Sequence, residues 1–162
     1  MRALRPAVLL FLAEAGCAGG GPPREAGPED EAAALEAVFR YQFDHNASSI
    51  RTAASLYCLC LPAAGREGGD PANDLLAHFA GNRPPAAACS ACALSAGRIV
   101  ERASGKSALS FYVAQVRWLP NGEAEVEGGY REGTASASRN RFRVVRRGAG
   151  WAVADVRSQR AP

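Results

Sequence analysis

The 162-residue sequence lacks the motifs that carry most enzyme chemistry. It has no glycine-rich phosphate loop, no serine, histidine and aspartate in the order of a hydrolase triad, and no paired-carboxylate motif. A metal site built on its only two histidines, His45 and His78, would need carboxylate partners that are not clustered near them. We interpret both histidines as helix-end or surface residues, and the sequence predicts no cofactor and no particular reaction.

Lysine is almost absent, since Lys106 is the only lysine among 19 basic residues, and the net charge is only +3. Arginines recur near the C-terminus, at Arg139, Arg141, Arg143, Arg146, Arg147, Arg157 and Arg160. No aromatic residues interleave with them as a platform for stacking bases would require. Glu123, Glu125 and Glu127 lie on a neighbouring predicted strand and can pair with them. We therefore expect a solvated, ion-paired sheet face and no nucleic-acid partner.

The longest N-terminal apolar run, residues 7–13, is too short to span a bilayer as a helix, which needs about 20 apolar residues. Arg2 and Arg5 precede it, as in a secretory signal. Cleavage before Gly16 and lipidation of Cys17 are both consistent with the residues that follow. We expect three segments: a signal peptide at 1–16, a flexible linker at 17–30 and a single domain at 31–162.

The first half of the domain predicts short elements around one clear helix. Residues 31–43 place Leu35, Val38, Phe39 and Phe43 on one face, behind an Asp30 cap. Four further elements are expected: a helical stretch at 48–54, a strand at 56–61, a helix beginning at Asp70 and Pro71, and a strand at 87–94.

Residues 108–160 predict an antiparallel meander of four strands. Alternation places Leu109, Phe111 and Val113 on one face of the first strand and Tyr112, Val116 and Trp118 on the other. Ala124, Val126, Gly128 and Tyr130 should face away from the glutamates, and Phe142 and Val144 away from the arginines. Gly128 and Gly129 indicate a bulge or a strong bend. We expect Trp151 of the last strand to pack against Phe39.

This order of elements, with Gly128-Gly129-Tyr130, residues 136–147 and the Gly150-Trp151-Ala152-Val153 strand, resembles the NTF2-like (SnoaL-like, cystatin-like cone) superfamily. The resemblance implies an α+β fold in which N-terminal helices pack on a bent antiparallel sheet, with a pocket at the mouth of the cone. It is similar to small exported bacterial proteins of that class. Some members use a pocket Asp, His or Tyr as a catalytic group, and many only bind ligands or dimerise.

Five cysteines are present, and four of them form a CxC at Cys58 and Cys60 and a CxxC at Cys89 and Cys92. Four thiolates could hold zinc, but an exported chain meets an oxidising compartment in which they would pair as disulfides. Cys58 and Cys60 should project from one face of a strand, so a bond between them would be strained. We therefore predict at least one disulfide from this pair to the Cys89 and Cys92 pair.

The pocket that the resemblance implies has three candidate lining residues, Asp155, Tyr130 and Trp118. Period two places Asp155 beside Trp151, where burial would raise its pKa and make it a candidate base. If a bulge reverses the register, Asp155 instead pairs with a surface arginine, which is the interpretation we favour.

Taken together, these features predict a non-enzymatic, exported binding domain of the bacterial cell envelope (periplasmic, or membrane-anchored through a lipid). Its partner would be a small ligand, an envelope protein or a second copy of the chain. A SnoaL-like isomerase or hydrolase using Asp155 or a histidine, or a zinc-stabilised module, is the alternative.

Overall fold

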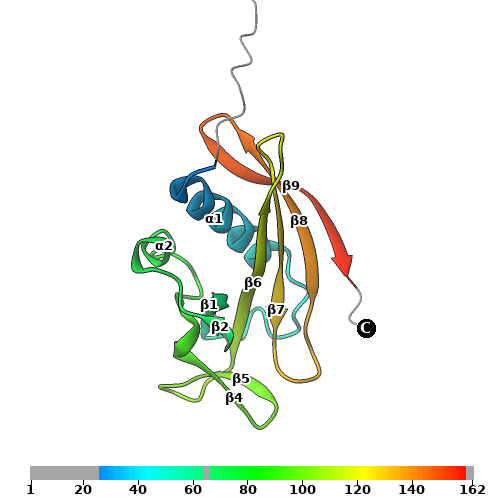
Figure 1. The fold of residues 1–162 in the computed structure, drawn as a ribbon. Coiled ribbons are helices and arrows are strands. Elements are labelled where there is room, and N and C mark those ends of the chain that lie inside the picture. The colour runs from blue at the N-terminus through cyan, green and yellow to red at the C-terminus, as the bar shows by residue number, and fades with distance from the viewer. Residues whose placement is uncertain (1–25, 64–65, 160–162) are drawn as a thin grey trace, which may run out of the picture.

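The structure is a computed structural model that describes residues 26–63 and 66–159. The expected signal peptide, Cys17, the linker before residue 26 and Arg160 lie outside the described residues. Within them the fold is α+β, with one long helix lying against one face of a large, mostly antiparallel sheet (Figure 1). In chain order the elements are α1 (Pro28–His45), β1 (Leu56–Ala63), β2 (Arg66–Gly69), α2 (Asn73–Ala77), β3 (Ala86–Ala88), the 3-10 turn η1 (Cys89–Ala91), β4 (Cys92–Ser95), β5 (Arg98–Glu101), β6 (Ala108–Trp118), β7 (Ala124–Arg131), β8 (Arg139–Arg147) and β9 (Gly150–Gln159).

The main sheet has the strand order β2-β1-β6-β7-β8-β9, and β3 pairs with β1 as well. Strands β6 to β9 form the antiparallel meander that the sequence predicts. β1 is instead parallel to β6, which places Cys58 beside Ser110 and Cys60 beside Tyr112. β6 is therefore an interior strand, whereas β2, β3 and β9 each pair with a single strand in the described part of the chain.

Helix α1 begins at Pro28, two residues before the predicted cap. Pro28 occupies its first turn, where a missing backbone N–H costs nothing. Asp30 is the third helical residue, and its carboxylate accepts a hydrogen bond from the Gly27 N–H (3.2 Å). The expectation that Asp30 itself caps the helix is wrong. The predicted apolar face is confirmed, because Leu35 and Val38 are buried against the sheet together with the two phenylalanines of the helix.

The space between α1 and the sheet is filled by aromatic rings. Phe43 of α1 lies 4.9 Å from Phe111 of β6 and 5.6 Å from Phe79, measured between ring centroids. Tyr57 of β1 lies 4.9 Å from Phe111, and Phe39 lies 6.2 Å from Phe79. Most of these pairs have the edge-to-face geometry that aromatic rings prefer. The core thus fills the space between α1 and the sheet.

A bulge at Ala114 changes the facing of β6. Leu109, Phe111 and Val113 point into the core as predicted, but the register with β7 shifts after Val113. Val116 and Trp118 consequently pack against the same core, so the prediction that they share a face with Tyr112 is wrong. One extra residue in a strand reverses every facing beyond it, which strict alternation cannot anticipate.

The paired glycines of β7 are required by close backbone contacts. A Cβ atom at Gly128 would lie 2.3 Å from the Tyr112 carbonyl oxygen, and one at Gly129 would lie 2.0 Å from the Ser138 carbonyl oxygen. The bulge that the glycines indicated is on the neighbouring strand β6, opposite Gly128. The other predicted facings of β7 and β8 are confirmed: Ala124, Val126, Phe142 and Val144 are buried.

Three predictions for the segment between α1 and β5 differ from the structure. Turns occupy 49–53 instead of a helix, because the Ser48 hydroxyl accepts the Ile50 N–H (3.2 Å) and competes with helical hydrogen bonding. Asp70 does not cap α2; its carboxylate accepts hydrogen bonds from the backbone and hydroxyl of Ser90, both at 2.7 Å. The predicted strand at 87–94 is divided into β3, η1 and β4.

Candidate ligand-binding site on the outer face of the sheet

Two disulfides join the cysteine pairs, Cys58 to Cys92 and Cys60 to Cys89. Cys58 and Cys60 alternate along β1, so both point to the face of the sheet opposite α1, which we call the outer face. The predicted cross-link is confirmed. Two disulfides in a chain of this size indicate an oxidising, extracytoplasmic environment.

The disulfides fasten η1, through Cys89, and the β4-β5 hairpin, through Cys92, over the outer face. Beneath it, Cys58 and Cys92 pack with Leu56 and Ala108 in a second small core, separate from the one under α1. The hairpin is also tied to the end of β7, because the Ile99 N–H donates to the Glu132 carbonyl oxygen at 2.7 Å. The 86–101 segment is thus held at both sides and forms a fixed wall above β1 and β6.

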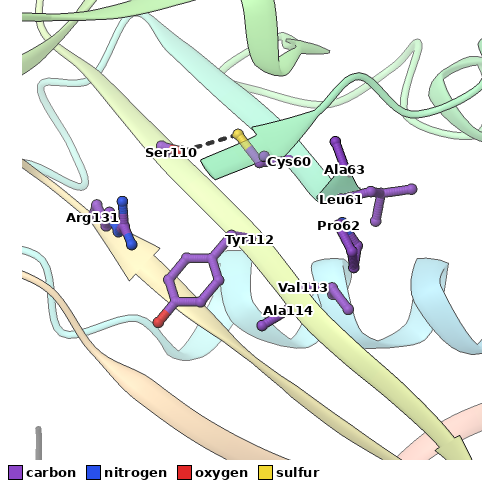
Figure 2. A pocket seen from close by; sticks show the side chains of 10 residues that line it. Cys60, Leu61, Pro62, Ala63, Ser110, Tyr112, Val113, Ala114 and Arg131 are labelled. Atoms are coloured by element: carbon purple, nitrogen blue, oxygen red, sulfur yellow. Dashed lines mark hydrogen bonds between the residues drawn. The ribbon is translucent and has the colours of Figure 1, made fainter. Parts of the chain in front are cut away.

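Two adjoining cavities open beside this wall. They share Cys60, Ser110 and Arg131, and their volumes are about 310 and about 500 Å³. The smaller cavity (Figure 2) is also lined by Leu61, Pro62, Ala63, Gly68, Tyr112, Val113 and Ala114. The larger is also lined by Cys89, Cys92, Ala93, Leu94, Ile99, Gly133, Thr134 and Ala137. Both volumes lie in the range of small-molecule sites, roughly 300–1,000 Å³.

The polar groups of the shared region come from neighbouring strands. Ser110 of β6 and Arg131 of β7 are cross-strand partners, and the Ser110 hydroxyl lies 3.3 Å from the Cys60 sulfur. The Arg131 guanidinium lies over the Tyr112 ring, 5.3 Å from its centroid. The Tyr112 hydroxyl donates to the Ser138 carbonyl oxygen at 2.8 Å, and burial raises the pKa of this phenol. Arg131 brings a positive charge to the region that the two cavities share.

The three residues expected in a pocket do not converge. A bulge at Ala154 shifts the register of β9, so that Asp155 is exposed on the outer face and lies 3.3 Å from the Arg157 guanidinium. This is the ion-paired arrangement that we favoured over a buried base. Trp118 packs against Trp151 instead, with ring centroids 5.3 Å apart.

Tyr130 is half-buried at the edge of the main core, 6.3 Å from the Phe111 ring. Burial raises the pKa of its phenol, and the charge of nearby Glu132 acts in the same direction. Neither Tyr130 nor Trp118 lines the two cavities. Sequence reasoning missed Ser110 and Arg131, because only the pairing of β6 with β7 brings them together.

The histidines occupy surface positions. His78 is exposed and its Nδ1 lies 2.6 Å from a Glu36 carboxylate oxygen. His45 is exposed at the end of α1, where its ring stacks on Tyr41 with centroids 4.0 Å apart. In the described residues no group of three or more His, Cys, Asp or Glu could hold a metal ion.

The arginines of β8 form the expected ion-paired face. Arg139 and Arg141 each contact the Glu127 carboxylate at 2.8 Å, and Arg143 contacts Glu123 at 3.3 Å. Hydrogen bonds from Arg139 and Arg141 lower the pKa of Glu127 to about 2. Arg146 pairs with Asp30 of α1, which links the end of the meander to the helix.

Comparisons with protein-family models, with curated proteins and with solved structures each gave no match for this chain. No helix in the described ranges combines the length and apolarity that a membrane crossing requires.

Proposed function

We propose that this protein is a non-enzymatic binding domain that works outside the cytoplasm and holds a small ligand in the two adjoining cavities of the outer face. The observation that carries the proposal is the placement of the disulfides. Cys58–Cys92 fastens the β4-β5 hairpin, Cys60–Cys89 fastens the η1 turn that precedes it, and Cys60, Cys89 and Cys92 line the larger cavity. A covalently fixed wall favours binding, because less conformational freedom is lost when the ligand enters.

Export and anchoring belong to the same proposal. The signal peptide at 1–16 would take the chain to the envelope, and lipidation of Cys17 would tether it to a membrane. The basic residues before the 7–13 apolar run support export, as does the oxidising environment that the disulfides indicate. An NTF2-like relationship is supported by the order of a long helix, a strand, a short helix and a four-stranded meander.

The contacts favour binding over the two alternatives. An isomerase or hydrolase of the SnoaL-like kind needs an acid or base inside its pocket, whereas Asp155, His45 and His78 are exposed. The face beneath α1 is occupied by aromatic rings. A zinc-stabilised module needs free thiolates, and the four sulfurs of the CxC and CxxC are bonded to one another.

Export is tested by expressing the full chain with a C-terminal tag in a bacterial host. We expect processed protein outside the cytoplasm, with Cys58–Cys92 and Cys60–Cys89 peptides in non-reducing maps. Detergent-phase protein should become aqueous in Cys17→Ser if Cys17 is lipidated. Uncut protein in the cytoplasm with free thiols would refute the assignment to the envelope.

Binding is tested with Nile red, a neutral apolar dye whose fluorescence rises in apolar surroundings. We expect saturable binding of one dye per chain. Leu94→Ser should weaken it, because Leu94 lines the larger cavity and is 57% exposed. Leu119→Ser, in the β6-β7 turn away from both cavities, is the matched control and should leave binding unchanged. A wild-type protein that binds no dye would overturn the proposed site.

A further inference from the structure

We propose that the open edge of β9 binds a second copy of this chain, and that the two β9 strands pair antiparallel about Val156. This surface is separate from the proposed ligand site, since no residue of β9 lines either cavity. In the described part of the chain β9 pairs with β8 alone, and its other edge receives no backbone hydrogen bond from another element (Figure 1). A strand edge of this kind is a template on which another chain can pair.

The charges on the outer face are in register across four strands. Arg117 of β6 lies opposite Glu125 of β7, and Glu125 lies opposite Arg143 of β8. Arg143 lies in turn opposite Asp155 of β9. The row therefore alternates in sign from strand to strand and ends at the edge of the sheet on a negative charge. A positive charge from a second chain would continue the alternation.

The row that ends two residues further along β9 closes on two like charges. Glu127 of β7 lies opposite Arg141 of β8, and Arg141 lies opposite Arg157 of β9. Like charges that are directly opposite each other on a sheet repel. Arg157 contacts Asp155 on its own strand at 3.3 Å, and both side chains are exposed. This row therefore favours a negative charge beyond the edge, beside the point where the first row favours a positive one.

A second copy of the chain supplies both charges in one register. When two β9 strands pair antiparallel about Val156, Asp155 of each copy lies opposite Arg157 of the other. Pairing centred on Asp155 or on Arg157 would place like charges opposite each other, and so would parallel strands in register. A shift by one residue would bring a side chain of the outer face opposite one of the core face. The edge is thus self-complementary in a single register.

The backbone hydrogen bonds hold such a pair together, and the charges select its register. Each exposed ion pair contributes little, and salt screens it. The bulge at Ala154 interrupts the edge, so the contact is confined to the C-terminal half of β9. We therefore expect a weak, reversible dimer whose dissociation constant rises with ionic strength.

Sedimentation equilibrium of the full chain tests the proposal, with Cys17→Ser in every sample so that no thiol remains outside the two disulfides. Asp155→Arg and Arg157→Asp each turn both attractive contacts into repulsive ones, and each should raise the dissociation constant about tenfold. Combining the two substitutions restores opposite signs and should restore the dimer. Lys106→Asp, at an exposed position in the β5-β6 turn, changes the net charge as Arg157→Asp does and should have no effect.

Two further measurements keep the test independent of folding defects. A mixture of the Asp155→Arg and Arg157→Asp chains should form a heterodimer although neither variant associates with itself, which an unfolded variant could not do. In Val156→Cys the two Cβ atoms would lie ~4.5–5.5 Å apart across the two-fold axis, so a short bismaleimide should join the chains. Ser158→Cys is the control, because its two copies would be four positions out of register, about 13 Å apart.

The outcomes separate the contact from its register. A chain with native β9 that stays monomeric up to about 1 mM, where even very weak complexes form, would refute the proposal. Self-association that neither charge reversal weakens would show that the dimer uses another surface. More efficient cross-linking of Ser158→Cys than of Val156→Cys would refute the pairing about Val156.

Discussion

Removing one disulfide should cost only about a third of the stability that is lost when both are removed, because the two bonds are nested. Cys58–Cys92 and Cys60–Cys89 close loops with sequence separations of 34 and 29 residues. The inner loop lies wholly within the outer one. Only two positions on β1 and three in the opposite segment separate the bonds.

The magnitude follows from the loop each bond closes in the unfolded chain. Either bond alone closes a loop worth about 3.7 kcal/mol at 25 °C in the chain-entropy relation. When the other bond is present, the additional ring has roughly six residues and is worth about 2 kcal/mol. Opening one bond should therefore cost about 2 kcal/mol, and opening both about 6 kcal/mol. That total is a large fraction of the ~5–15 kcal/mol that stabilises a typical domain.

The measurement is urea unfolding of three variants under non-reducing conditions, each bond being removed by a pair of Cys→Ala substitutions. Removing the Cys58–Cys92 bond should lower the free energy of unfolding slightly more than removing the Cys60–Cys89 bond. Cys58 and Cys92 lie in the small second core, whereas Cys60 and Cys89 border an open cavity. Losses near 4 kcal/mol for each single removal, adding in the double removal, would refute the nested-loop reasoning.

Three further outcomes are expected. Trp151→Ala should lower the free energy of unfolding in urea by about 2 kcal/mol, because the ring is only half-buried against Trp118. A fully buried tryptophan would cost ~3–5 kcal/mol, so a loss above ~3 kcal/mol would show that the ring is packed more deeply than described. The Glu127 pKa is lowered from 4.5 to about 2, so its ion pairs stabilise the fold above pH 4.5 and this stabilisation is lost as the pH falls towards 2. Glu127→Gln should therefore make the free energy of unfolding depend less on pH in that window. An unchanged pH dependence would contradict the assignment. Gly129→Ala should lower the free energy of unfolding by ~1–3 kcal/mol, because the new Cβ atom would meet the Ser138 carbonyl oxygen. Gly150→Ala on β9 is the control, since open space surrounds that position. Equal midpoints of the two variants in thermal melts would refute the close approach at Gly129.

Elements whose signal is local could be predicted from the sequence. The apolar face of α1, the strand at β1 and the meander from β6 to β9 all follow from side-chain periodicity within one segment. The cross-linking of the two cysteine pairs was also predictable, because Cys58 and Cys60 alternate on a strand and cannot bond each other without strain. The errors at Asp30, Asp70 and the 48–54 stretch arise where a side chain competes with the backbone for the same hydrogen bonds.

The sequence by itself determined which residues favour helix or strand and which four cysteines cross-link. The tertiary structure decided which cysteine meets which, where β1 lies in the sheet, and how far each alternation holds. The bulges at Ala114 and Ala154 turned Trp118 into the core and Asp155 out of it. Ser110 and Arg131 lie 21 positions apart along the chain and share a site only because β6 and β7 pair in one register. Register and bulge position depend on the packing of both faces at once, and no single segment carries that information.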